Sequence, residues 1–302
     1  MFLIGLVTGI LTAILQSVSY VCSAAFLNQN KSSLQLAVFS QIAMGMICLP
    51  FLPFFFPREI FEGKIGSFFT ALLLWIAVFA VGQICFFATL NKIESSRASS
   101  LLGLKILFLA VIYVIITREM LSWLQWFSVI LCTIAAVGMN WSGGKKITVS
   151  GILPLCLTVI FYCFADMLET HMVRIPASGD IIRDTFGISL VCYSVLGLFS
   201  LPLLLKFKMT GKQFLMACPF AVTWYLSQFT LFICFGTVGT VFGNVLLSAR
   251  GIFSVFAGMI LLAWGLERYD AKISIQMWAR RIVFSVMMTA AIILFSMTAR
   301  PS

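Results

Sequence analysis

The sequence has 302 residues, of which 61% are hydrophobic and 10% charged, with a formal net charge of +10. A single soluble core could not bury this much apolar surface, and the apolar runs are long enough to cross a bilayer, which predicts a polytopic helical membrane protein. The net positive charge does not indicate nucleic-acid binding, because the cations stand singly in short connectors, as juxtamembrane charges do.

The apolar runs of the first half predict five membrane spans separated by short polar connectors. The first span is not followed by a cleavage-site pattern, so we expect it to be retained rather than removed as a signal peptide. Pro50 and Pro53 are expected to kink or fray the end of the second span. The five spans are placed near residues 3–24, 34–56, 67–90, 98–117 and 121–141.

The second half repeats this pattern after the linker SGGKKITVS at 142–150, which is the predicted seam between two units. The longest connector, 171–183, is too short to form a domain, and His171, the only histidine, is expected to have an ordinary role at a helix end. The five spans of the second half are placed near residues 150–170, 184–205, 213–234, 240–265 and 276–298.

Two of the predicted spans carry a fixed positive charge, Lys105 in the fourth and Arg250 in the ninth. Such a charge costs roughly 3 kcal/mol to insert, so it is expected to face a partner or a cavity instead of lipid. A shift of 145 residues maps Arg250 onto Lys105 and Gln228 onto Gln83, which indicates two tandem copies of one unit.

The repeat divides the chain into residues 1–146 and 149–302, with five spans in each unit. Because five is an odd number, the second copy must insert in the opposite sense, which is the inverted-repeat plan of secondary transporters. The predicted fold class is therefore an all-α membrane protein with ten transmembrane helices in two inverted five-helix repeats. The glycine pair Gly5 and Gly9, and the glycines Gly239, Gly243 and Gly251, are expected to allow close helix packing.

Polar residues also recur on the first span of each half. A shift of 146 residues maps Tyr162, Asp166 and Glu169 onto Gln16, Tyr20 and Ser23, and this spacing places them on one helical face. Such a face could line a cavity or supply hydrogen bonds between packed spans. The candidate substrate-binding residues are Gln16, Tyr20, Gln83, Lys105, Tyr162, Asp166, Gln228, Asn244 and Arg250.

The two cations leave two interpretations open. In the first, Lys105 and Arg250 face one midplane cavity and hold an anionic group of the cargo, while Asp166 tunes the site or carries a coupling proton. In the second, each cation pairs internally, for example with Asp166 or Glu169, and only holds spans together.

Several stretches resemble the EamA-like branch of the bacterial drug/metabolite transporter superfamily, over essentially the whole chain. They are SRASSLLGLKI, TREML, LQWFSVILCTIAAVGMNWSGG, LLSARGIFSVF and GLER. The resemblance implies a multi-pass transporter of the cell membrane, here the bacterial inner membrane, that moves a small metabolite by alternating access. Many members have a proline where this chain has Lys105 and Arg250, and some phosphate-carrying relatives have cations there, so an anionic cargo is favoured.

Two other functions remain open, an intramembrane enzyme and a scaffold or receptor that transports nothing. The sequence lacks a G-x-x-x-x-G-K-[ST] phosphate loop, a G-x-S-x-G elbow and an H-E-x-x-H motif, and its nine cysteines form no C-x-x-C pair. We therefore expect no enzyme, catalytic residue, metal or cofactor. The expected partners are a small-molecule substrate, the lipid bilayer and, in the first interpretation of the cations, a coupling proton.

The orientation in the membrane is a separate question. With a cytoplasmic amino terminus, the connectors and tail on that side would carry six cations and those on the other side ten. The positive-inside rule thus favours both termini outside, whereas the family resemblance implies both termini in the cytoplasm.

Overall fold

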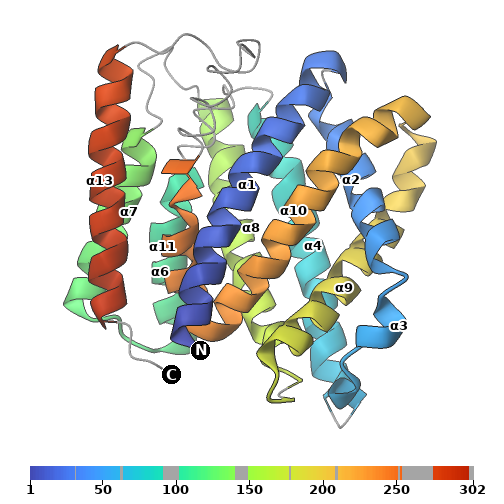
Figure 1. The fold of residues 1–302 in the computed structure, drawn as a ribbon, viewed down its shortest axis with the longest axis horizontal. Helices are drawn as coiled ribbons and strands as arrows, with labels where there is room; N and C mark the ends of the chain where they lie inside the picture. Colours follow the sequence, from blue (N-terminus) through green and yellow to red (C-terminus); the bar gives the residue numbers. More distant parts are fainter. Residues whose placement is uncertain are drawn as a thin grey trace.

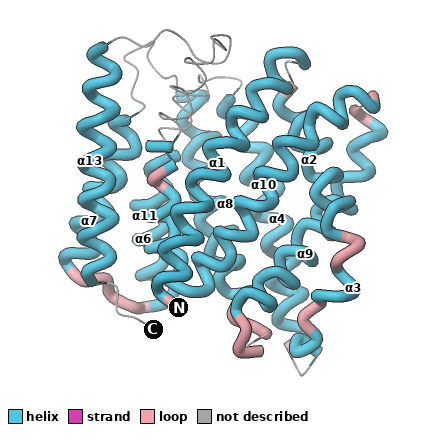
Figure 2. The backbone as a smooth tube through the Cα atoms, viewed as in Figure 1, coloured by secondary structure: helices cyan, strands magenta, loops and turns pink. Residues whose placement is uncertain are grey.

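The computed structural model describes most of the chain as packed helices. The described residues are 1–30, 32–61, 64–90, 102–139, 149–176, 178–207, 210–250, 252–253 and 275–298. Figure 2 shows that these residues form helices joined by short loops, and no strand occurs among them. This part of the structure confirms the all-α class.

The long helices of the first half begin and end close to the predicted spans. They are α1 (Phe2–Asn30), α2 (Ser33–Cys48), α4 (Ile65–Leu90), α6 (Lys105–Thr117) and α7 (Trp123–Met139). Three short segments connect them, α3 (Leu52–Phe55), η1 (Arg58–Phe61) and η2 (Leu102–Leu104).

Two boundaries in this half differ from the prediction. Helix α1 continues through Asn30, whose side-chain amide donates to the Phe26 carbonyl within the helix at 3.3 Å, and Ser32 then caps the start of α2. The predicted second span 34–56 is wrong at its end, because α2 stops at Cys48 and a separate turn, α3, follows with Pro53 near its start. The two prolines thus end the helix instead of kinking it.

The second half contributes another series of helices. They are α8 (Val149–Val173), α9 (Ile181–Ser200), η3 (Leu201–Leu205), α10 (Gly211–Val238), α11 (Thr240–Leu247) and α13 (Ile275–Thr298). Asp180 caps α9 by accepting from the backbone N–H groups of Ile182 and Arg183, and Thr210 caps α10 in a reciprocal box with Gln213. The second part of the predicted ninth span lies outside the described residues, since 251 and 254–274 are among those left out.

Length and apolar composition fit a membrane location. Helices α1, α4, α8, α9 and α10 are long and apolar enough to cross a bilayer, and α2, α6, α7 and α13 contain shorter apolar stretches. Large apolar side chains such as Leu73, Ile115 and Val286 are exposed on the outside of the bundle. A surface of this kind is typical of lipid contact, and the chain is a multi-pass membrane protein.

The closest pairs of helices each join one half of the chain to the other. Helix α1 lies along α10 and α4 along α8, while α2 packs against α9 and α7 against α13 (Figure 1). The halves are therefore interleaved instead of forming two separate bundles.

Glycines make the closest of these contacts possible. A Cβ on Gly197 of α9 would lie 2.7 Å from the Cα of Gly45 in α2, so the two backbones touch where the helices cross. Gly5 and Gly9 are packed in the same way, against Thr237 and Leu246, as their spacing predicts.

The glycines at the start of the ninth predicted span have different roles. Gly243 packs closely as expected, since a Cβ there would lie 2.5 Å from the Phe235 ring. The expectation was wrong for Gly239, where an added Cβ would meet nothing within 4 Å and where φ is +82°. Gly239 is needed for the left-handed turn between α10 and α11. Gly251 lies outside the described residues.

Candidate binding site

The first cluster of candidate residues surrounds Lys105, the first residue of α6. Its Nζ lies 2.6 Å from Oδ2 of Asp166 in α8. The same oxygen accepts a hydrogen bond of 2.6 Å from Nδ2 of Asn244 in α11. The ammonium also lies 5.8 Å from the centre of the Tyr162 ring, within range of a cation–π interaction. Four of the candidate residues from three helices thus meet at one point.

Local hydrogen bonds fix this cluster in place. Asn244 also donates to the Thr240 carbonyl at 3.0 Å, which holds its amide against its own helix. The hydroxyl groups of Thr240 and Thr170 lie 2.7 Å apart and join α11 to α8 beside the ion pair. Asp166 is only 5% exposed, so its carboxylate depends on Lys105 and Asn244 for the charge and the donors that water would otherwise supply.

The second cluster surrounds Arg250, which lies just beyond the end of α11. Its Nη1 donates a hydrogen bond of 3.1 Å to Oε1 of Gln16 in α1, a side chain that is 3% exposed. The Arg250 carbonyl accepts a hydrogen bond of 3.0 Å from the Ser17 hydroxyl. Each cation therefore contacts the first helix of the opposite half, Lys105 on α8 and Arg250 on α1.

A third polar group lies one helical turn after Asp166. Glu169 is 3% exposed, and its Oε1 accepts a hydrogen bond of 2.9 Å from Nε1 of Trp75 in α4. Its Oε2 has no hydrogen-bond partner among the described residues. The Trp75 indole stacks on Phe79 at 5.1 Å and meets the edge of Tyr193 at 6.0 Å between ring centres.

The sequence placed Glu169 on the polar face of its span and offered it as an ion-pair partner for a cation, but it did not identify Trp75. A tryptophan within an apolar span is itself a signal, because its indole N–H needs an acceptor when it is buried. The acceptor could not be named from the sequence, since it comes from another helix.

Three candidate residues are not joined to these clusters by the described contacts. Gln83 is half-buried in α4, and Gln228 is buried in α10. Tyr20 lies in α1, and its side chain is outside the described residues. Six of the candidates, Gln16, Lys105, Tyr162, Asp166, Asn244 and Arg250, thus remain as the core of a possible site.

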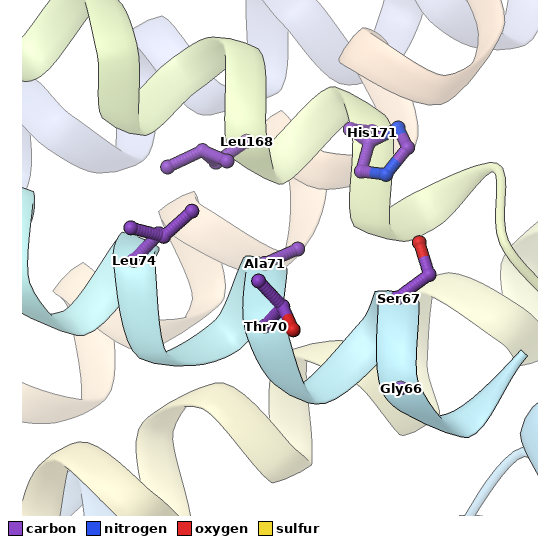
Figure 3. A pocket seen from close by; sticks show the side chains of 7 residues that line it. All are labelled: Gly66, Ser67, Thr70, Ala71, Leu74, Leu168 and His171. Carbon is purple, nitrogen blue, oxygen red and sulfur yellow. The ribbon is translucent and has the colours of Figure 1, made fainter.

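A cavity of about 300 Å³ lies elsewhere, between α4 and α8 (Figure 3). Its lining residues are Gly66, Ser67, Thr70, Ala71, Leu74, Leu168 and His171, and none of the candidate residues is among them. His171 lies in the last turn of α8, which confirms its predicted place at a helix end.

Comparisons with known proteins bear on the family. Residues 3–141 match the model of the EamA-like transporter family. No curated protein sequence matches the chain. A solved structure titled "Crystal structure of protein" covers 98% of this chain and 97% of its own, with a TM-score of 0.69 and 12% sequence identity, a likeness that shows the fold alone.

The family match covers the first of the two predicted repeats and stops close to the predicted seam. The same resemblance in the second half is a prediction from its motifs. The match implies a membrane transporter, and the similar solved structure extends the likeness in fold over both halves. Residues 3–141 are thus identified as EamA-like transporter sequence, which confirms the resemblance to the drug/metabolite transporter superfamily.

Proposed function

We propose that the protein is a secondary active transporter that moves a small anionic metabolite across the cytoplasmic membrane by alternating access. The single observation that carries this proposal is the position of the two cations. Lys105 and Arg250 each reach across to the first helix of the opposite half. Lys105 lies over the Tyr162 ring and Arg250 donates to Gln16, and the internal repeat makes Tyr162 and Gln16 equivalent. Functional charges within membrane spans are typically placed between repeats in this way.

The helix pairing supports two inverted five-helix units, residues 1–146 and 149–302. In two units related by a two-fold axis, a contact between the first helix of one and the third helix of the other must occur twice. The contacts α1 with α10 and α4 with α8 form such a couple, and so do α1 with α11 and α8 with α6. The pairs α2 with α9 and α7 with α13 each join corresponding helices of the two units, so the two-fold axis maps each of these contacts onto itself.

The chemistry of the clusters favours an anionic cargo. Asp166 presents a carboxylate oxygen to Lys105 and Asn244, and a carboxylate or phosphate oxygen of the cargo would fit the same donors. Arg250 would add a planar fork of N–H donors, which suits bidentate binding of such groups. In this proposal the cargo displaces Asp166 from Lys105 when it binds.

The proposal is tested by thermal unfolding of the purified protein with organic phosphates, dicarboxylates, amino acids, sugars and cationic drugs. At least one anionic class should raise the unfolding midpoint of the wild type, and it should then be taken up or exchanged by proteoliposomes. Arg250→Gln should fold but lose that response, while Arg183→Gln, at an exposed position, should keep it. Stabilisation by cationic drugs alone would contradict the proposed cargo class.

A further inference from the structure

Glu169 is a buried carboxyl group that takes no part in the proposed anion site around Lys105 and Arg250. It lies on α8, facing α4 and α9, and the Trp75 indole donates to Oε1 while Oε2 has no hydrogen-bond partner among the described residues. An ionised carboxylate accepts hydrogen bonds on both oxygens, and burying it without them is costly. A neutral carboxyl places its carbonyl at Oε1, which accepts from Trp75, and its O–H group at Oε2, where burial without a partner costs less than it does for an ionised oxygen.

The charges around Glu169 point in the same direction. The titratable groups that interact with Glu169 are Asp166 on its own helix, Lys105 on α6, and Cys192 and Tyr193 on α9; Cys48 on α2 and Tyr225 on α10 lie beyond them, next to the two α9 groups. Among them Lys105 is the cation, and its ammonium is already 2.6 Å from Asp166. One positive charge balances only one of the two carboxyl groups, so a proton on the second would leave this group of side chains neutral.

We propose that Glu169 is the proton-binding site of the transport cycle, while Asp166 serves as the partner of Lys105 when no cargo is bound. The proton would lie on Oε2, the oxygen that has no donor among the described residues. When the cycle exposes this part of α8 to water, the proton passes from Oε2 to water and leaves the carboxylate. This inference rests on the proposed transport function, and it moves the coupling proton from Asp166 to Glu169.

Infrared difference spectroscopy of the purified protein in liposomes can test this without a known cargo. The C=O stretching band of a protonated carboxyl should be present at neutral pH, where exposed carboxyl groups are ionised, and should disappear as the pH is raised. Glu169→Gln should remove this band, whereas Glu119→Gln, which changes an exposed glutamate, should leave it unchanged. A band that survives in Glu169→Gln, or one that does not respond to pH in the wild type, would overturn the proposal.

A second variant keeps the test decisive if Glu169→Gln does not fold. Trp75→Phe removes the donor to Oε1 while leaving the carboxyl in place. Because a hydrogen bond to a carbonyl oxygen lowers its stretching frequency, the band should move to higher frequency in Trp75→Phe. An unshifted band would assign the proton to another carboxyl group. Since the measurement needs no transport, its failure would leave the anion-transporter proposal to be judged by the cargo screen.

Discussion

Lys105 Nζ and Asp166 Oδ2 are 2.6 Å apart, so a cation of the first half is neutralised by the first helix of the second half. For Lys105, the described conformation therefore agrees with the interpretation of internal pairing. The two interpretations are compatible if the pair exists without cargo and opens when an anion binds. The pair then holds the halves together during the part of the cycle in which nothing is carried.

Breaking this pair from one side should cost stability. Lys105→Gln leaves Asp166 buried with Asn244 as its described donor, and a loss of about 3–5 kcal/mol in the free energy of unfolding is expected. Adding Asp166→Asn removes the stranded charge and should restore most of the loss. Denaturant unfolding of the two single variants and the double variant measures the coupling directly. Strictly additive effects would contradict the buried ion pair.

A carboxylate introduced beside Arg250 should imitate the Lys105 cluster. Gln16→Glu places a negative charge at the atom that now accepts a hydrogen bond from Arg250, so stability should be kept or increased. If Arg250 binds the anionic cargo, the same change should weaken cargo binding by about tenfold or more, which corresponds to about 1.4 kcal/mol.

The matched control for this charge is Gln29→Glu, which adds the same group at an exposed position of the same helix. It should leave cargo affinity within about twofold at moderate ionic strength, because exposed charges are screened. Equal losses in both variants would indicate a general effect of net charge instead of competition at Arg250.

The crossing of α2 and α9 should not accept side chains. Gly197→Leu would force apart backbones that now touch at Gly45, and overpacking of this kind costs about 1–3 kcal/mol. Gly66→Ala is the control, because an added Cβ there meets nothing within 4 Å. Thermal unfolding should separate the two variants, and a neutral Gly197→Leu would show that the crossing can open freely.

Reporter fusions should establish the layout of the spans. With five spans in each half, reporters in the linker 142–150 and after Ser302 must lie on opposite sides of the membrane. The same pair of fusions decides between the orientation favoured by the charge distribution and the one implied by the family. Reporters on the same side would contradict the division into five and five.

The sequence predicted the helices well, because long apolar runs and polar connectors are local signals. It could not predict the end of α2 at Cys48, since a proline can either kink a helix or stop it. Asp166 was named as a partner of a cation, but the choice of Lys105 over Arg250 depends on which helices cross. The hydrogen bond between Trp75 and Glu169 joins residues far apart in the chain, and no local sequence pattern predicts such a contact.

Helix α11 connects the two cation clusters in a way that reaches beyond either one. Asn244 donates a hydrogen bond to Asp166 of the second half. Arg250, just past the end of the same helix, donates one to Gln16 of the first half. A tilt of this short helix would therefore change both the Asn244–Asp166 and the Arg250–Gln16 hydrogen bond. We therefore expect that an anion bound at Arg250 shifts α11 and with it the Asn244 amide that holds Asp166. Binding at one cation would in this way change the surroundings of the other.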